Sequence, residues 1–230
     1  MKKLSSQRNR IFERLPAKGV DELFPHARTV DLQHGQSLQE PGKPTGIIYF
    51  PETAVVSFLG NAGNGATAEV WSVGSEGIAG ISGLISATCP FRAVVQIPGT
   101  AKAINRSILL RQFSKGGALH DYVLQYYQRL LIQAAQLGVC NQMHAVEQRF
   151  SRWLLMLLDR SRAPNLKMTQ DSIAVALGTR RATISIAAAA LQNAKLISYT
   201  PGSITINSRR GLQAATCGCY KLIKAEFDAA

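Results

Sequence analysis

The sequence predicts an α+β fold in three parts: a β-rich N-terminal domain over residues 1–116, one long helix over 117–142, and a C-terminal domain over 143–230. Three observations support this division. Short apolar runs separated by glycine, proline and asparagine fill residues 20–110. A segment with a heptad period follows. After this segment, the pattern predicts two helices that meet at a glycine and, shortly after them, two short strands.

The N-terminal part contains the apolar runs "GIIYF", "AVVSFLG", "AEVWSV" and "RAVVQI", with turn signals between them. The turns are predicted from Pro-Gly at 41–42, "NAGNG" at 61–65 and Pro-Gly at 98–99. Many short strands punctuated in this way favour a sandwich, a roll or a barrel.

The central segment "ALHDYVLQYYQRLLIQAAQLGVC" contains no proline and would form a helix about 35 Å long. Seven positions on one side of it, mostly apolar, alternate by four and three residues, as in the seam of a coiled coil. Those positions are Leu119, Val123, Tyr126, Leu130, Gln133, Leu137 and Cys140. Such a stripe can also lie against its own domain. We favour parallel dimerisation through residues 117–140.

A second helix is predicted in "HAVEQRFSRWLLMLLDRS", with one apolar face and with Arg149 and Arg152 on the opposite face. The apolar face consists of Val146, Phe150, Trp153, Leu154, Leu157 and Leu158. Pro164 cannot continue a helix, so "RAPNLK" is expected to be a loop.

The stretch "TQDSIAVALGTRRATISIAAAALQ" reads as two helices rather than one. Thr169 is suited to cap a helix over Gln170–Leu177, and Gly178 is suited to the left-handed residue that ends it. Thr179 is expected to cap the next helix, over about 180–194. The small Ala174 would let the two helices cross closely, which is the arrangement of a helix-turn-helix.

The segment "LISYTPGSITI" then reads as strand, Pro-Gly turn and strand. A helix-turn-helix followed by a β-hairpin is a winged helix, and Arg180 and Arg181 stand where its second helix would enter a major groove. The alternative is an alanine-rich helical hairpin that binds no ligand.

The net charge is +12, and the last 71 residues carry +7 of it. This excess favours a polyanionic partner, first nucleic acid and second an anionic membrane surface. No apolar run approaches the roughly 20 residues of a membrane span, and the basic N-terminus lacks the apolar core of a signal peptide, so a cytoplasmic protein with no membrane partner is expected.

The four cysteines, Cys89, Cys140, Cys217 and Cys219, form no CxxC pair. Cys217-Gly-Cys219 could bind a metal, but two thiols with no nearby histidine make a poor site, so ordinary packing is the expectation. No metal site and no cofactor are predicted.

The order of these parts resembles the Crp/Fnr family of bacterial transcription regulators, most specifically in "NQMHAVEQRFSRWLLML" (141–157) and in residues 168–206. The resemblance implies a cyclic-nucleotide-type β-roll, a central helix that pairs in a homodimer, and a winged helix-turn-helix that binds palindromic promoter DNA. RNA polymerase is a further partner that the resemblance suggests.

The resemblance also points to ligand-binding positions at Gly80, Arg92 and Ala93. Ile81 stands where the ribose-binding glutamate of the cyclic-nucleotide members should be, and Ala93 replaces a hydroxyl residue beside Arg92. Cyclic AMP binding is therefore not expected, and Arg92 is either a remnant or a ligand for another anion. The absence of cysteine before Cys89 disfavours the iron–sulfur branch, and His144 is interpreted as structural.

In the second helix of the helix-turn-helix, Arg181 matches the family's common DNA-contacting arginine, while Ala182 and Ile186 replace a glutamate and a second arginine. The readout of the best-known members is therefore not transferable. The predicted DNA-binding residues are Thr169, Gln170, Thr179, Arg180, Arg181, Thr183, Ser185 and Ser203.

Two other functions remain open. The first is a regulator whose sensor is vestigial and which acts without a ligand or under a partner protein. The second is a β-roll metalloenzyme, which is disfavoured because His26 and His34 lie eight residues apart and the chain has no HxH pair. We therefore expect no enzymatic activity.

Overall fold

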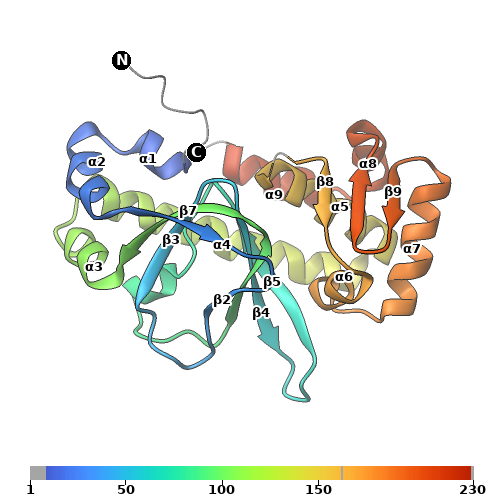
Figure 1. The fold of residues 1–230 in the computed structure, drawn as a ribbon, viewed down its shortest axis with the longest axis horizontal. Helices are drawn as coiled ribbons and strands as arrows, with labels where there is room; N and C mark the ends of the chain where they lie inside the picture. Colours follow the sequence, from blue (N-terminus) through green and yellow to red (C-terminus); the bar gives the residue numbers. More distant parts are fainter. Residues whose placement is uncertain (1–8, 162, 229–230) are drawn as a thin grey trace. The chain divides into compact units, whose positions relative to one another are not determined.

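The computed structural model describes residues 9–161 and 163–228 and combines β-sheets with helices (Figure 1). The chain forms two compact units. The first contains the chain up to Phe58 together with Ser72–Gln128, and the second contains Leu59–Trp71 together with the chain from Arg129 onward. The boundary between Gln128 and Arg129 falls inside the long helix α4 (Ala118–Met143).

The predicted α+β fold is confirmed, and short helices that the sequence reading did not predict precede the strands. The N-terminal elements are α1 (Arg10–Arg14), α2 (Ala17–Leu23), η1 (Phe24–His26), β1 (Arg28–Leu32), β2 (Ser37–Gln39), β3 (Ile47–Pro51), β4 (Val55–Asn61), β5 (Thr67–Val73), η2 (Ile81–Leu84), β6 (Arg92–Ile97), β7 (Gly99–Asn105) and α3 (Arg106–Ser114). All four apolar runs quoted above form strands.

These strands make two sheets, in the orders β1-β7-β3 and β2-β6-β4-β5. Strand β7 pairs antiparallel with both neighbours, so that Ala103 lies opposite Arg28 on one side and Tyr49 on the other. A small apolar cluster of Leu32, Ala54, Val95 and Ala101 is buried within this part. Strand β4 buries its first four residues and β6 its last three, and such consecutive burial accounts for the short apolar runs of the sequence.

Two tyrosines of helix α4 contact the loop before η2 and the first residue of η2. A Cβ on Gly77 would lie 1.9 Å from the hydroxyl oxygen of Tyr126, so the ring occupies the space that any other residue at position 77 would need. The next residue, Tyr127, donates a hydrogen bond from its hydroxyl to the Ile81 carbonyl at 2.9 Å. Glycine is required here by close approach of a side chain.

The heptad stripe of α4 is not the exposed seam of a coiled coil. All seven of its residues are buried within the chain itself, from Leu119 at 7 % exposed to Gln133 and Cys140 at 0 %. The prediction that this stripe pairs with a second copy is therefore wrong. The physical reason is that a long helix which packs along its own chain needs a continuous apolar stripe just as a coiled coil does.

The second unit is built around α5 (Val146–Ser161). Its buried residues run without a gap from Arg149 to Leu157, so this part of the helix is covered on all sides. Arg149 and Arg152, predicted on the face opposite the apolar one, are also buried, at 9 % and 2 % exposed. Trp153 is also buried, and its indole N–H donates to the Glu69 carboxylate at 3.2 Å.

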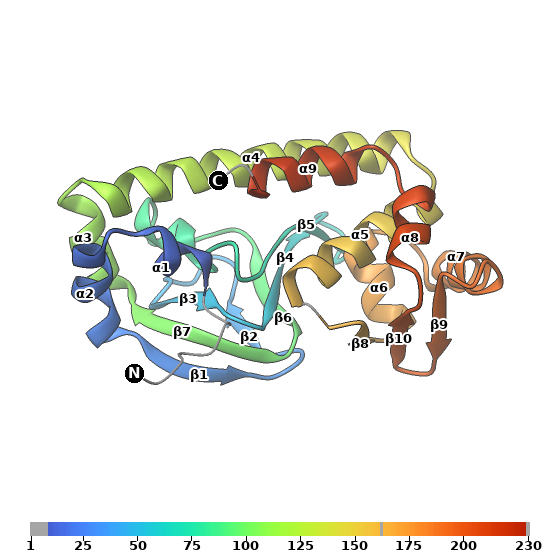
Figure 2. The same ribbon diagram turned by 90° about the horizontal axis from the view of Figure 1, so that it is seen from above.

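The remaining elements of the second unit are β8 (Asn165–Lys167), α6 (Gln170–Leu177), α7 (Arg181–Asn193), β9 (Ile197–Thr200), β10 (Ser203–Ile206), α8 (Arg209–Ala215) and α9 (Cys219–Asp228). The predicted hairpin of β9 and β10 is present, and β8 joins it to give a sheet in the order β8-β10-β9 next to α7 (Figure 2). Residues 165–167, expected as loop, therefore form a strand, because β10 supplies the pairing partner.

The axes of α6 and α7 differ by 105° across their short turn. Gly178 ends α6 in the left-handed conformation, with φ at 58°, as predicted. The prediction that Thr179 caps α7 is wrong. The cap position is Arg180, while the Thr179 N–H bonds back to the Ala174 carbonyl at 3.0 Å and so belongs to the end of α6.

Among the described residues, no single helix is both long and apolar enough to cross a bilayer. Helices α6 and α7 reach that length and composition only as a pair, and the pair is sharply bent. Their apolar side chains include Ile173, Leu177 and Ile184, which are buried in the protein.

The turn gives a first prediction. Gly178→Ala should lower the free energy of unfolding by about 1–2 kcal/mol, because an L-residue with a Cβ is strained in the left-handed region. The new Cβ would also lie 3.1 Å from the Cβ of Ala68. Urea denaturation followed by circular dichroism measures the change. Gly46→Ala is the control, since Gly46 lacks a positive φ and a Cβ at that position would meet no neighbour within 4 Å. Equal stability of the two variants would contradict the prediction.

Candidate nucleic-acid interface

The N-terminal end of α7 presents two arginines to solvent. Arg180 and Arg181 are both exposed, and they follow directly after the turn that separates α7 from α6. The Arg181 Nε lies 3.8 Å from the Asp171 carboxylate, with both side chains about two-thirds exposed. Exposed pairs of this kind contribute about 0–1 kcal/mol, so Asp171 leaves Arg181 available to an anionic ligand.

The other predicted DNA-binding residues lie around this end of α7, and several already have partners. The Thr169 hydroxyl accepts from the Ser172 N–H in a capping box at the start of α6. The Ser185 hydroxyl donates to the Gln170 side chain at 2.7 Å, which links α7 to α6. Thr183 is half-buried in the first turn of α7.

Ser203 belongs to the hairpin rather than to the helices. Its hydroxyl donates to the Asn165 side chain at 2.6 Å, between strands β10 and β8. The structure therefore gathers Gln170, Arg181 and Ser185 at one end of α7 and places Ser203 in the three-stranded sheet.

The outward face of α7 contains apolar residues that the predicted DNA-binding set omitted. Ile186 is 67 % exposed, and Ala182 and Ala189 are exposed on the same face. The opposite face buries Ile184, Ala187 and Leu191. The helical period could have identified this stripe, because residues 182, 186 and 189 follow one another at spacings of four and three. Small apolar side chains in a major groove contact the thymine methyl group.

Part of the basic charge in the C-terminal 71 residues is internal. Arg160 is buried and donates to the Gln133 side chain. Arg209 forms a short ion pair with Asp159, and the Tyr220 hydroxyl donates to the same carboxylate at 2.8 Å. Burial, together with this hydrogen bond, raises the pKa of Tyr220 above its ordinary value. Arg162 lies outside the described residues. The charge available to a ligand is therefore concentrated at fewer arginines and lysines than the sequence suggests.

The positions that correspond to the nucleotide cassette are closed to a ligand of the expected chemistry. Gly80 is left-handed and begins η2, but Ile81 beside it is 3 % exposed and Ala93 is 1 % exposed. The exposed Arg92 pairs with Glu40 at 3.4 Å. Hydrogen bonding by Ser37, together with the charge of Arg92, holds the pKa of Glu40 below its ordinary value. Arg92 thus has an anionic partner within the protein.

One cluster of potential metal ligands occurs among the described residues, at Cys140, His144, Cys217 and Cys219. The expectation that no histidine lies near Cys217 and Cys219 is wrong. The His144 Nδ1 lies 3.6 Å from the Cys219 Sγ, although 75 residues separate the two in the sequence. Sequence spacing could not show this, because it depends on how α9 returns to the end of α4.

The two helices crossing at 105°, the left-handed glycine between them and the three-stranded sheet behind define a winged helix-turn-helix domain. A family model described as the Crp-like helix-turn-helix domain matches residues 148–215. Residues 148–215 are thus a helix-turn-helix domain of the Crp type, which is a DNA-binding domain of transcription regulators.

Solved structures extend the likeness over most of the chain. FixK2 from Bradyrhizobium japonicum has a TM-score of 0.70 at 15% identity, covering 84% of this chain and 98% of its own. The c-di-GMP responsive regulator CLP from Xanthomonas campestris has a TM-score of 0.67 at 17% identity, covering 84% and 100%. A Crp/Fnr-family regulator from Thermus thermophilus has a TM-score of 0.65 at 18% identity, covering 82% and 97%. The chain therefore has the fold of Crp/Fnr transcription regulators.

The search of the curated proteins finds no match. The resemblance thus stands on the helix-turn-helix domain and on the fold, and the residues that differ from the family pattern must be interpreted from their own surroundings.

The closed cassette gives a second prediction. Saturating cyclic AMP should leave the melting temperature of the protein unchanged, because a ligand raises the melting temperature only if it binds the folded protein. Differential scanning calorimetry with and without the nucleotide measures this, with AMP as the control for non-specific binding. A rise of more than about 2 °C with cyclic AMP alone would show that the cassette binds it.

Proposed function

We propose that this protein is a homodimeric DNA-binding transcription regulator that recognises palindromic promoter sites through α7. The observation that carries the proposal is the exposed end of α7, where Arg180 and Arg181 follow a sharp turn and are not committed to buried partners. Helix α7 has 13 residues and is about 20 Å long, which suits a helix lying in a major groove.

The roles of individual residues follow from where they lie. Arg181 is the candidate for a base contact, since an arginine can donate two hydrogen bonds to guanine. Arg180, at the cap position of α7, is placed for a phosphate or a base. Ile186 and Ala182 would contact thymine methyl groups, and Ser203 in the sheet, with Thr169 and Thr179 at the ends of α6, would contact phosphates.

A palindromic site requires two copies of α7 related by a two-fold axis, about one helical turn of DNA apart. We infer that the copies pair through the face of α4 opposite to its buried heptad stripe. That face exposes Leu124, Leu131, Val139 and Met143, at 45 %, 70 %, 52 % and 74 %. From Leu130 to Met143 the helix has no charged residue. A helix face without charge and with exposed leucines is typical of a dimer interface.

The signal that controls this regulator is a separate question. The burial of Ile81 and Ala93 supports a regulator that does not respond to a cyclic nucleotide. A ligand-independent or partner-controlled regulator is therefore the second candidate. A contact with RNA polymerase remains an expectation from the resemblance. Such a regulator would work in the cytoplasm of a bacterial cell, where the chromosome lies.

The third prediction concerns Arg181. Arg181→Ala should cost about 1–3 kcal/mol of binding free energy, roughly a 5- to 150-fold rise in Kd, and should relax the preference at one base pair of each half-site. The site is first obtained by selection from random DNA, and Kd is then measured by fluorescence anisotropy over a range of salt concentrations.

Two variants sharpen this experiment. Arg111→Ala removes the same charge from an exposed position of α3 in the other unit and should leave Kd unchanged. Asp171→Asn removes the carboxylate beside Arg181 and should tighten binding, because that carboxylate would repel phosphate. If random DNA yields no palindrome, or if Arg181→Ala binds like the wild type, the proposal is wrong.

The fourth prediction concerns the dimer. Leu131→Lys places a charge in the exposed face of α4 and should convert the dimer to a monomer, which sedimentation equilibrium measures directly. Leu222→Lys is the matched control, since Leu222 is 58 % exposed on α9 and should tolerate the charge without dissociation. A wild-type monomer, or a Leu131→Lys variant that stays dimeric, would contradict the assignment of this face.

A further inference from the structure

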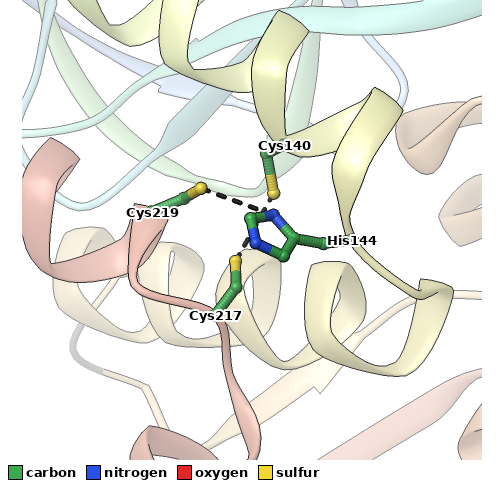
Figure 3. Close-up of side chains that lie close together, drawn as sticks. All are labelled: Cys140, His144, Cys217 and Cys219. Carbon is green, nitrogen blue, oxygen red and sulfur yellow. Dashed lines mark hydrogen bonds between the residues drawn. The ribbon is translucent and has the colours of Figure 1, made fainter.

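Three cysteines and one histidine from two distant segments converge at the end of α4. The ligand atoms of Cys140, His144, Cys217 and Cys219 all lie within 4.8 Å of one another. In Figure 3 the Cys140 and His144 side chains come from the end of α4 and the turn after it, while Cys217 and Cys219 come from the segment that leads into α9. All four side chains point into the same space.

Local structure brings each pair into place. Cys140 and His144 are four residues apart, and the His144 N–H bonds to the Cys140 carbonyl at 3.1 Å, so both side chains lie on one face of the last helical turn. Cys217 and Cys219 are separated by one glycine, and Cys219 is the first residue of α9.

The distances match a mononuclear tetrahedral site. The Cys140 and Cys217 sulfurs are 3.5 Å apart, and the Cys219 sulfur is 3.6 Å from His144 Nδ1. Zinc bonds of about 2.3 Å to sulfur and about 2.0 Å to nitrogen give tetrahedral edges of roughly 3.8 Å between two sulfurs and roughly 3.5 Å between sulfur and nitrogen. Two edges of the cluster are therefore close to those of such a tetrahedron, and the other distances between ligand atoms are no longer than 4.8 Å.

Burial indicates a closed site rather than one open to substrate. The three cysteines are 0 %, 5 % and 3 % exposed. The Gln136 amide donates to the Cys219 sulfur at 3.1 Å. Three thiolates and an imidazole are a donor set that holds structural zinc.

Two buried arginines beside the cluster supply an independent reason to place an anionic centre there. The Arg152 guanidinium acts electrostatically on both Cys140 and Cys217, and Arg149 interacts with Cys140 and Arg152. The Nε atoms of both arginines are buried and have no hydrogen-bond partner among the described residues. Neither arginine forms an ion pair with a carboxylate in the described part of the chain.

Buried cations without a counter-charge are costly to a fold. A divalent cation held by three thiolates and a neutral imidazole has a single net negative charge, and it would stand next to these two guanidinium groups. With neutral thiols instead, the arginines would face no negative charge from the cluster.

We propose that Cys140, His144, Cys217 and Cys219 bind one divalent ion of the zinc class in a closed tetrahedral site that ties the start of α9 to the end of α4. None of the four residues is a candidate for DNA contact, so this site stands independently of the proposed DNA binding. Arg149 and Arg152 are charge-compensating neighbours, and they do not ligate the ion.

The fifth prediction tests the site on the intact protein. The full chain, purified under reducing conditions and incubated with zinc, should retain one zinc ion per chain after gel filtration, as measured by mass spectrometry of the metal. X-ray absorption at the zinc edge should show three sulfurs at about 2.3 Å and one nitrogen at about 2.0 Å. Cobalt substitution should give the visible bands of a tetrahedral thiolate complex. These three measurements need no variant.

Variants then assign the ligands. Cys217→Ser and His144→Ala should each lose the retained zinc, whereas Cys89→Ser should keep it in full, because Cys89 is a buried cysteine outside the cluster. Circular dichroism shows whether each variant has folded. If a variant has not folded, the X-ray absorption spectrum of the wild-type protein still identifies the ligand atoms.

The proposal is overturned by any of three results. The reduced protein could retain no zinc, the metal could be iron accompanied by inorganic sulfide, or a Cys140–Cys217 disulfide could form in place of a metal site. Retention of zinc by Cys217→Ser and Cys89→Ser alike would also overturn it, since the ion would then be bound elsewhere.

Discussion

The burial of the α4 heptad stripe within its own chain is the constraint on which the rest of the structure depends. Its first three residues, Leu119, Val123 and Tyr126, belong to the first unit, and the remainder from Leu130 to Cys140 belong to the second. One continuous helix therefore provides core residues to both units. Because that stripe is used internally, it is not available to a second copy, whereas Leu131 on another face of α4 is exposed.

Helix α5 shows how the second unit handles charge inside its core. Arg149 donates to the Leu177 carbonyl at the end of α6, and Arg152 reaches the Met156 sulfur. Arg209, Asp159 and Tyr220 form a second internal network. Because these arginines have internal partners, they are not available to a ligand. The candidate interface at α7 therefore depends on the few basic side chains exposed there, and the total charge of the domain contributes little to it.

The sequence predicted the elements whose causes are local. Gly178 ends α6, the Pro-Gly turn joins β9 to β10, and Thr169 caps α6, because a turn conformation or a cap depends on a few neighbouring residues. Prediction failed where a distant partner decides the outcome. The periodicity of α4 could not reveal what covers its apolar stripe, and the alternation around Arg152 could not reveal that α5 is enclosed.

The candidate DNA-contact residues were recognisable for the same local reason, since Arg180 and Arg181 follow the turn directly. Ile186 was recognised only as a departure from the family pattern, although its exposure follows from the period of α7. The cysteine–histidine cluster lay beyond sequence reasoning altogether. Its two halves are 73 residues or more apart, and no spacing rule connects the end of one helix to the start of another across that distance.

Gly77 and Tyr126 have a consequence for how this chain can change over evolution. The two positions share one volume, because the tyrosine hydroxyl stands where a side chain on residue 77 would begin. The order of substitution is therefore restricted: residue 126 must become smaller before residue 77 can become larger. In the reverse order, a variant with a larger residue at position 77 would still have Tyr126, and the tyrosine ring would have to move out of the core. Homologous sequences should accordingly vary at these two positions together, and a tyrosine at 126 should be accompanied by glycine at 77.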